Sequence, residues 1–342
     1  MTPPTAPLDV LLTVSFSEDQ LAQLRQLSPR LRLTTVPTRT IDEIPAELLS
    51  RAEVLYTDRV IPTPTQAPNL KWVQFHFAGI DFALDAPLLA QPDVQFTTLS
   101  GAAAPQVAEY TVMMLLALGH RLPDVIASQS KAEWSRNRWE RFAPSELRGS
   151  TVGILGYGSI GREIARLLHP WGVQLLAVKR DVMNPEDGGY MPAGLGDPSG
   201  DYFTRLYPMQ AIHSMLKLCD YIVICLPLTA HTRGLINAEA LAACKPDAKL
   251  VHIGRGGVVD QASLLNALQE KKIAGAALDV FSEEPLPPDS PFWKLQNVII
   301  SPHIAGISPF YQDRAVAMFS ENLRRYLESA PLLNRFDPVR GY

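Results

Sequence analysis

The sequence has no hydrophobic run long enough to cross a membrane. Its longest apolar stretches, residues 112–118 and 221–228, are far shorter than the roughly 20 residues that a membrane-spanning helix needs. The first nine residues, MTPPTAPLD, carry neither the positive charge nor the apolar core of a secretory leader. We therefore expect a cytoplasmic protein without a membrane contact.

Cysteine is scarce, which limits both disulfides and metal sites. The chain has only three, Cys219, Cys225 and Cys244, an odd number at no spacing typical of metal ligands, and each lies in an apolar segment. We expect reduced cysteines packed in the core and no metal site.

An excess of positive charge is also missing. The 342 residues include 31 Lys and Arg against 35 Asp and Glu, which gives a net charge of −4. This balance, without any basic run, argues against a nucleic-acid partner or an anionic membrane surface. The expected partner is a small molecule.

What the sequence does contain is a repeated alternation of strand and helix patterns. In the first hundred residues, strands are expected over 8–14, 54–56, 70–77 and 94–99, with a helix over 18–27. One long helix over 105–130 leads to a second series of strands over 151–155, 172–178, 221–226, 249–253, 275–280 and 298–301. Such alternation is typical of an α/β protein with doubly wound parallel sheets, and the length allows two domains.

The second series is arranged around residues 151–168, TVGILGYGSIGREIARLL. A short apolar strand is followed by Gly156, Gly158 and Gly161 in the order G-x-G-x-x-G, and then by a helical pattern that Pro170 ends. In this motif the first glycine makes the turn, the second lets a pyrophosphate approach the backbone, and the third lets helix and strand pack closely. The strand and helix around the glycines favour a dinucleotide site over a structural turn.

The end of the next strand indicates which dinucleotide binds. NAD sites usually have an acidic residue about 20 positions after the glycines, whereas a basic side chain there suits the 2′-phosphate of NADP. Lys179 and Arg180 occupy this place, so we expect NADP. Asp181 keeps NAD open, and the two cations could instead form a solvated strand end.

Two further segments have no part in this pattern. Residues 184–208 are rich in glycine and proline without periodicity, and we expect a long insertion that acts as a flap over the adenosine end of the coenzyme. Residues 134–142, WSRNRWERF, combine Trp134 and Trp139 with arginines, which fits either a subunit interface or an ordinary surface loop.

Asp279 lies at the end of an expected strand, and Arg255, Glu284 and His303 each follow one. Ligands of doubly wound sheets lie off the carboxyl ends of the strands, so these residues can converge. His303 is the expected general acid/base because histidine ionises near neutral pH, and Glu284 would orient the ring and favour its protonated form. Arg255 could bind the carboxylate and carbonyl oxygen of a 2-oxo acid, while His252 is expected to pack or to bond to the backbone.

In the first series, residues 77–81 read FAGID at the end of a strand. Ala78 and Gly79 carry no large side chain, so their backbone N–H groups could hold a substrate carboxylate. A plain strand-to-helix turn is an equal alternative.

Together these motifs resemble the D-isomer-specific 2-hydroxyacid dehydrogenases. The resemblance rests on LGYGSIG (155–161), CLPLTAHT (225–232), HIGRGGVVD (252–260), LDVFSEEPLP (278–287) and SPHIAG (301–306), and extends to residues 78–81 and to PLLNRFDP (331–338). It implies two Rossmann-like domains with the active site in the interdomain cleft, and a homodimer formed through the region before Thr151. The substrate domain, flavodoxin-like, would comprise residues 1–105 and 307–342, and the dinucleotide-binding domain residues 106–306.

The same motifs imply roles for single residues. Arg255 would bind substrate, Glu284 would support His303 as the general acid/base, and Ala78 and Gly79 would bind the substrate carboxylate. The residues expected to contact the coenzyme are Gly156, Gly158, Ser159, Ile160, Gly161, Lys179, Arg180, Pro227, Thr232, Ile253, Gly254, Arg255, Asp279, His303 and Gly306.

The resemblance implies reversible, NADP- or NAD-dependent reduction of a small 2-oxo acid, similar to glyoxylate or hydroxypyruvate, to the D-2-hydroxy acid. Lys179 stands where NAD-preferring members usually carry aspartate, which favours NADP. His252 replaces a common asparagine, and residues 75–77 (FHF) are bulky, so the substrate stays open. The alternatives are a short-form phosphoglycerate dehydrogenase and, since related corepressors keep this fold, a nucleotide-gated interaction protein.

Overall fold

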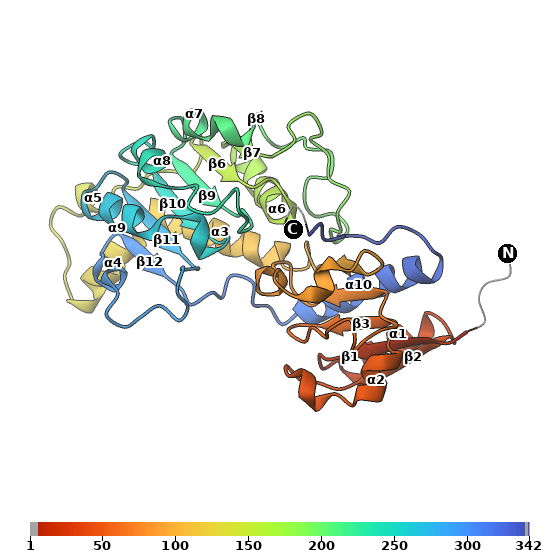
Figure 1. Cartoon of the computed structure of the whole chain (residues 1–342). Helices are drawn as coiled ribbons and strands as arrows, with labels where there is room; N and C mark the ends of the chain where they lie inside the picture. Colours follow the sequence, from red (N-terminus) through yellow and green to blue (C-terminus); the bar gives the residue numbers. More distant parts are fainter. Residues whose placement is uncertain (1–5, 339–340, 342) are drawn as a thin grey trace. The chain divides into compact units, whose positions relative to one another are not determined.

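The computed structural model describes residues 6–338 and 341, so the first five residues of MTPPTAPLD lie outside the described part. The chain forms two compact units. Unit 1 takes both ends of the chain, up to Ala103 and from Ser308, and unit 2 is the continuous segment Ala104–Ile307. Each unit is built on its own parallel sheet (Figure 1).

Unit 1 has a five-stranded sheet with the order β2-β1-β3-β4-β5, and all its strand pairs are parallel. The strands are β1 (Leu8–Leu12), β2 (Leu31–Thr35), β3 (Val54–Thr57), β4 (Trp72–Phe75) and β5 (Gln95–Thr97). This is the flavodoxin-like order. Every residue of β3 and β4 is buried, as expected for central strands covered on both faces.

Helices cover both faces of this sheet. Helices α1 (Glu18–Gln26) and α10 (Tyr311–Leu327) pack on one face, where Phe319 of α10 lies against Tyr56 and Trp72. Helix α2 (Ala46–Arg51) contributes Leu49 to the core on the other face. The last long helix of the chain therefore completes the core that the first hundred residues begin.

Unit 2 has a seven-stranded parallel sheet with the order β12-β11-β10-β9-β6-β7-β8. Its strands are β6 (Thr151–Leu155), β7 (Gln174–Val178), β8 (Arg205–Tyr207), β9 (Tyr221–Ile224), β10 (Lys249–His252), β11 (Gly275–Leu278) and β12 (Val298–Ile300). The chain leaves β6 toward β7 and β8, then returns to continue from β9 on the other side. The strand order thus reverses between β6 and β9, where ligands of doubly wound sheets bind.

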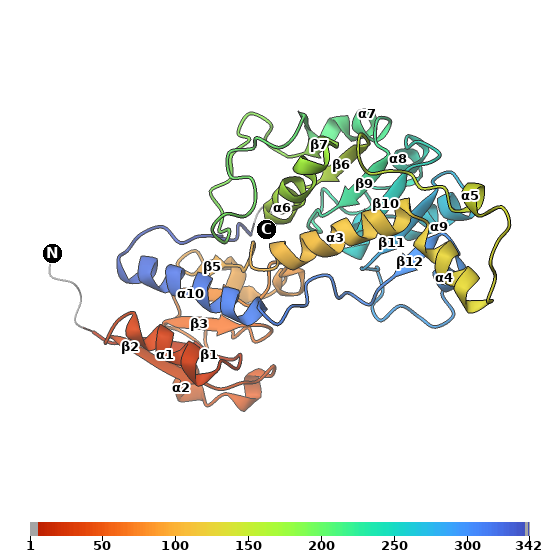
Figure 2. The same ribbon diagram turned by 180° about the vertical axis from the view of Figure 1, so that it is seen from behind.

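The two faces of this sheet carry different helices. Helices α3 (Ala104–Gly119) and α6 (Ser159–Leu168) lie side by side, with α3 also packed on β10 and β11 (Figure 2). Helices α7 (Ile212–Leu216), α8 (Ala238–Ala242) and α9 (Gln261–Gln269) bury their apolar side chains on the opposite face. Both faces are therefore covered, which explains the continuous apolar strands.

The expectation of one helix over 105–130 is wrong. Helix α3 ends at Gly119, and α4 (Leu122–Ser130) begins after Arg121, whose φ of +53° is left-handed. A left-handed residue cannot continue an α-helix, and Pro123 in the first turn of α4 is suited to a new helix start. The apolar periodicity continued across the break and hid it. A short helix, α5 (Arg138–Arg141), follows.

Three other short elements were missed. Strand β2 reads LRLTT and is mostly half-buried, and α2 has only six residues after Pro45, so neither carries a strong apolar pattern. Strand β8 lies inside the region expected to be an irregular insertion, and it pairs with Leu176–Val178 of β7. Short edge elements depend on their neighbours more than on their own sequence.

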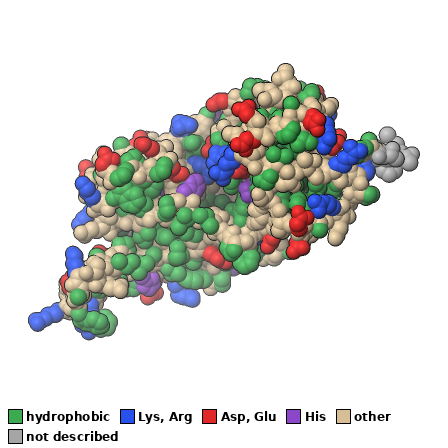
Figure 3. Space-filling model, turned by 90° about the horizontal axis from the view of Figure 1, so that it is seen from below, with side chains coloured by type: hydrophobic (Ala, Val, Ile, Leu, Met, Phe, Trp, Pro, Cys, Tyr) green, Lys and Arg blue, Asp and Glu red, His purple; other side chains and the backbone are tan. Residues whose placement is uncertain are grey.

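No helix in the described part of the chain is long and apolar enough to span a membrane. On the face shown in Figure 3, acidic and basic side chains are interspersed among apolar ones.

Candidate functional site

The glycine turn joins β6 to α6 with the geometry that its motif requires. Gly156 has a φ of +105°, which other residues rarely adopt, and a Cβ on Gly161 would lie 2.2 Å from the carbonyl oxygen of Gly156. The turn and the close packing expected of these two glycines are confirmed. A Cβ on Gly158 would meet no atom within 4 Å, so the backbone there is open to a ligand.

Helix α6 begins directly after this turn. Ser159 and Ile160 form its first turn, and the leading N–H groups of a helix have no partner within it. Those N–H groups and the helix dipole favour an anion at this end. An open glycine backbone beside the start of a ten-residue helix fits a pyrophosphate.

Lys179 and Arg180 follow β7 and lie at the same edge of the sheet as the glycine turn. The ammonium of Lys179 donates to the carbonyl oxygens of Asn184 and Glu186, the latter at 2.8 Å. Arg180 is exposed. That the backbone of the following loop holds Lys179 could not be predicted, because carbonyl groups leave no pattern in a sequence.

The loop after β9 is closed by Thr232. Its Oγ1 donates to the carbonyl oxygen of Pro227 at 2.6 Å and accepts the amide N–H of Thr229 at 2.8 Å. A Cβ on Gly254, just after β10, would lie 2.6 Å from the carbonyl oxygen of Leu226. The loops after β9 and β10, which carry expected coenzyme residues, are therefore tightly packed against each other and within themselves.

Arg255 follows β10, where Ile253 is buried at the strand end. The Arg255 guanidinium is half-buried, and its Nη1 donates to the carbonyl oxygen of Gly254 at 3.0 Å. The neighbouring Gly256 packs so tightly that a Cβ there would lie 1.9 Å from the carbonyl carbon of Phe281. The loop that carries Arg255 is thus in direct contact with the loop after β11.

Glu284 and His303 meet although they lie 19 positions apart. The Nδ1 of His303 is 2.8 Å from Oε2 of Glu284, and the other carboxylate oxygen accepts the amide of Phe281 at 2.9 Å. Both side chains remain partly exposed, 46% for His303 and 37% for Glu284. The carboxylate thereby fixes the ring through Nδ1, and Nε2 is the nitrogen that can exchange a proton with a ligand.

The turn that carries His303 is organised by the buried carboxylate of Asp279. This carboxylate, 2% exposed, accepts the hydroxyl of Ser301 at 2.6 Å and the amides of Ile304 and Ala305 at 2.9 Å each. His303 itself has a φ of +54°, and its amide donates to the carbonyl oxygen of Asp279 at 2.8 Å. Such a conformation persists only where surrounding contacts impose it.

Tyr110 of α3 extends this network, a contact that the sequence did not reveal. Its hydroxyl lies 2.5 Å from Oγ of Ser301. Burial raises the pKa of Tyr110 to about 12, so it stays protonated. Gln106, one turn earlier, donates to the carbonyl oxygen of Gly306 at 2.8 Å. Helix α3 thus supports the turn after β12 at two points.

His252, at the end of β10, is 2% exposed. Its ring lies close to the backbone of Ile224 and Arg255, yet neither ring nitrogen has a hydrogen-bond partner of good geometry among the described residues. Burial lowers the pKa of His252 to about 4, so the ring is neutral at pH 7. Of the two expected roles, packing is found and the backbone hydrogen bond is not.

In unit 1, Ala78 and Gly79 follow β4. Ala78 is exposed and Gly79 half-buried, and neither amide donates to a backbone acceptor in the part of the chain that the structure describes. The bulky residues before them point mostly inward, since Phe75 and His76 are buried and only Phe77 is half-buried. The two amides are therefore available to an anion.

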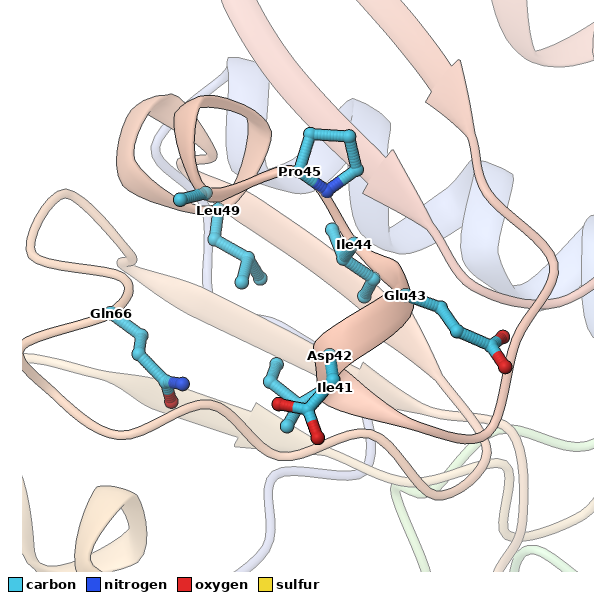
Figure 4. Close-up of a pocket in the computed structure, with 8 residues that line it drawn as sticks. Ile41, Asp42, Glu43, Ile44, Pro45, Leu49 and Gln66 are labelled. Carbon is cyan, nitrogen blue, oxygen red and sulfur yellow. The ribbon is translucent and has the colours of Figure 1, made fainter.

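Unit 1 also contains a surface hollow of about 540 Å³ (Figure 4). It is lined by Ile41, Asp42, Glu43, Ile44, Pro45, Ala46, Leu49 and Gln66. None of these is basic or an expected site residue, so the hollow offers no positively charged side chain for an anionic substrate.

The three cysteines are free, and burial raises the pKa of Cys219 and Cys225 to about 12 and of Cys244 to about 11. Such thiols are poor nucleophiles at neutral pH. Within residues 6–338 and 341, no group of three His, Cys, Asp or Glu side chains could hold a metal ion.

Comparison with known proteins places this geometry in a family. Residues 112–305 match the model of the D-isomer specific 2-hydroxyacid dehydrogenase, NAD binding domain. Glyoxylate reductase of Thermofilum pendens is 34% identical over 272 residues, covering 79% of this chain and 76% of that protein. D-3-phosphoglycerate dehydrogenase of Homo sapiens is 37% identical over 207 residues, which cover 60% of this chain but only 35% of that protein.

A solved structure resembles the whole chain. The D-isomer specific 2-hydroxyacid dehydrogenase from Xanthobacter autotrophicus Py2, in complex with NADPH and MES, has a TM-score of 0.80 and 30% sequence identity. The match covers 98% of this chain and 100% of that one. The chain belongs to the D-isomer specific 2-hydroxyacid dehydrogenase family.

Proposed function

We propose that the protein reversibly reduces a small 2-oxo acid, such as glyoxylate or hydroxypyruvate, to the D-2-hydroxy acid with NADPH or NADH. The observation that carries this proposal is the pair formed by His303 and Glu284 at 2.8 Å, on the sheet edge that also carries Arg255 and the glycine turn. A proton donor, a cation and a coenzyme turn at one edge are the groups that carbonyl reduction needs.

The residues of unit 2 fit a nicotinamide dinucleotide. The open backbone at Gly158 and the first turn of α6 would receive the pyrophosphate. Lys179 and Arg180 would favour the 2′-phosphate of NADP, and the similar structure from Xanthobacter autotrophicus Py2 was solved with NADPH. When bound, the reduced coenzyme supplies a hydride to the carbonyl carbon of the substrate.

His303 would deliver the proton. Nδ1 is held by Glu284, so Nε2 of the protonated ring donates to the carbonyl oxygen as the carbon is reduced, and the neutral ring then regains a proton from solvent. The negative charge of Glu284 stabilises the protonated ring before transfer. In the oxidative direction the same nitrogen would accept the hydroxyl proton.

Arg255 would bind the substrate through two of its N–H groups, one to the carboxylate and one to the carbonyl oxygen. Its positive charge would also stabilise the negative charge that develops on that oxygen. In unit 1, the amides of Ala78 and Gly79 remain a proposed site for a carboxylate. These contacts would select for an acid that carries its carbonyl group at position 2.

We also propose a homodimer through the segment before Thr151. Apolar side chains gather there on the surface, with Ile126 54%, Trp134 86% and Trp139 79% exposed. Exposed apolar surface of this kind marks interfaces. A dimer in sedimentation that becomes a monomer in the Trp134→Ala, Trp139→Ala double variant would support this, and a wild-type monomer would refute it.

A panel of 2-oxo acids with NADH and NADPH, followed by the absorbance of the reduced nicotinamide, tests the function. The similarity to the D-3-phosphoglycerate dehydrogenase of Homo sapiens supports a second candidate, a phosphoglycerate dehydrogenase. The panel therefore includes the oxidised form of 3-phosphoglycerate. Turnover of glyoxylate or hydroxypyruvate supports the first proposal, and turnover of the phosphorylated acid alone supports the second. Coenzyme binding without any turnover would favour the nucleotide-gated interaction protein.

A further inference from the structure

The loop between β7 and β8, residues 179–204, is not explained by the proposed reaction. It includes most of the insertion expected from the sequence. Figure 1 and Figure 2 both show it beside α6. Its contacts with that helix are made by buried charged groups, which is unusual for a surface loop.

The first anchor is the guanidinium of Arg162 in α6, which is 1% exposed. It donates to the carbonyl oxygens of Pro185 and Asp197, and its Nε lies 3.3 Å from Oδ2 of Asp187. Its central carbon also lies 4.8 Å from the ring centre of Tyr157. One helical side chain thus joins three points of the loop that are up to 12 positions apart.

The second anchor is the carboxylate of Asp197, which is 2% exposed. It accepts the amides of Gly200, Asp201 and Tyr202 at 2.8–3.1 Å, which closes a turn within the loop. It also accepts the hydroxyl of Tyr157 at 2.5 Å. Tyr157 stands between the first two glycines of the pyrophosphate turn, so the loop is bonded directly to that turn.

The third anchor is the carboxylate of Glu163, which is 1% exposed and accepts the amide of Gly196 at 2.6 Å. Gly196 has a φ of +72°, and a Cβ there would lie 2.9 Å from Met191. Three buried charged side chains therefore fix the loop. Opening the loop would leave these charges without their partners, which favours a fixed element over the expected flap.

The start of the loop holds Lys179. Its ammonium donates to the carbonyl oxygens of Asn184 and Glu186, which lie on either side of Pro185, the residue bound by Arg162. An ammonium has three N–H donors, so one remains for a ligand. Burial, and after it the positive charge of Arg162, lowers the pKa of Lys179.

We propose that the β7–β8 loop is a fixed wall of the coenzyme site that aims the ammonium of Lys179 at the 2′-phosphate of NADP, with Asp197 as its main anchor. This rests on the proposed function, because it assumes a nicotinamide dinucleotide on the glycine turn. A lysine without this support would lose rotamer freedom on binding, whereas a lysine already held by two carbonyls is preorganised. Selection for NADP would thus depend on residues far from the phosphate.

The test measures the dissociation constants of NADPH and NADH by fluorescence titration, which needs no turnover. Lys179→Ala should reduce the preference for NADPH about 10- to 100-fold, the usual value of a charge-assisted contact. Asp197→Asn should reduce it about 3- to 10-fold, since the loop is loosened but Lys179 keeps its charge. Asp201→Asn, the same change of charge at an exposed position of the same loop, should leave the preference unchanged.

The decisive variant combines the first two changes. If the loop acts through Lys179, adding Asp197→Asn to Lys179→Ala should not change the preference further. Tyr157→Phe, which removes only one hydroxyl, replaces Asp197→Asn if that variant does not fold. Independent effects in the double variant, or an unchanged preference in Asp197→Asn and Tyr157→Phe, would overturn the inference. Failure of the wild type to bind either coenzyme would instead refute the proposed function.

Discussion

Two histidines at the same sheet edge of unit 2 differ in almost every physical respect. His303 follows β12, is 46% exposed and lies 2.8 Å from a carboxylate. His252 ends β10, is 2% exposed and has no hydrogen-bond partner of good geometry among the described residues. Identical side chains on nearby strands therefore fit opposite roles. One is available for proton transfer, and the other is held neutral in the core.

The strongest test of this contrast is His303→Ala. We expect kcat/KM for 2-oxo acid reduction to fall about 10²- to 10⁴-fold, the usual contribution of a positioned acid, while coenzyme affinity changes little. Steady-state kinetics and coenzyme titration check both. His213→Ala is the matched control. His213 lies on α7, outside the candidate site, so this variant should keep its activity. Full activity of His303→Ala would refute the assignment.

Asp279→Ala should separate the support of His303 from its chemistry. The change leaves the Ser301 hydroxyl and two turn amides without their acceptor, at a cost of about 2–4 kcal/mol of stability. Because His303 then loses its fixed conformation, kcat should fall as well. Urea denaturation and kinetics measure the two effects. Wild-type values of both would show that the carboxylate does not organise the turn.

His252→Asn should change stability rather than catalysis. In the folded protein the pKa of His252 is about 4, against an ordinary value of 6.5, so its contribution is complete above pH 6.5 and is lost as the pH falls toward 4. Between pH 7.5 and 5, the wild type should lose about 2 kcal/mol of unfolding free energy through this group. Urea denaturation at the two pH values should show that His252→Asn loses less unfolding free energy than the wild type, by this amount.

His76 in unit 1 is a second buried histidine, and burial lowers its pKa to about 4 as well. His76→Asn should reduce the acid-induced loss of stability in the same direction. Equal pH dependence in the wild type and in both variants would contradict the neutral, buried state of these rings.

Among the variants expected to lower activity, Glu284→Gln should have the smallest effect on kcat/KM. The amide keeps the size of the side chain but removes the negative charge that stabilises the protonated ring of His303. We expect about a 10-fold loss of kcat/KM for reduction. Steady-state kinetics measure it, and a kcat/KM equal to that of the wild type would show that the carboxylate has only a steric role.

Much of this site could be predicted from the sequence. Gly156 and Gly161 have their expected geometry, and His303 meets Glu284 because both follow neighbouring parallel strands. Such predictions succeed where the chemistry lies in side chains with a fixed relation to a strand end. The sequence assigned His303 to proton transfer and allowed packing for His252, but the exposed fractions of 46% and 2% depend on the packing of distant residues and could not be predicted.

Other features of the fold were also beyond the sequence. Arg121 carried no signal for the left-handed conformation that separates α3 from α4. The anchors of the β7–β8 loop were missed for a related reason. Arg162 donates to backbone carbonyls, and Asp197 accepts backbone amides, and such partners are the same at every position of a chain.

The most direct test of the proposed reaction mixes the NADPH-bound protein with hydroxypyruvate and follows the absorbance of the reduced nicotinamide. We expect the absorbance to decay, with the D-hydroxy acid as the product, and to decay little in His303→Ala. Stable absorbance with this and every other 2-oxo acid, while NADPH remains bound, would contradict the proposed reaction.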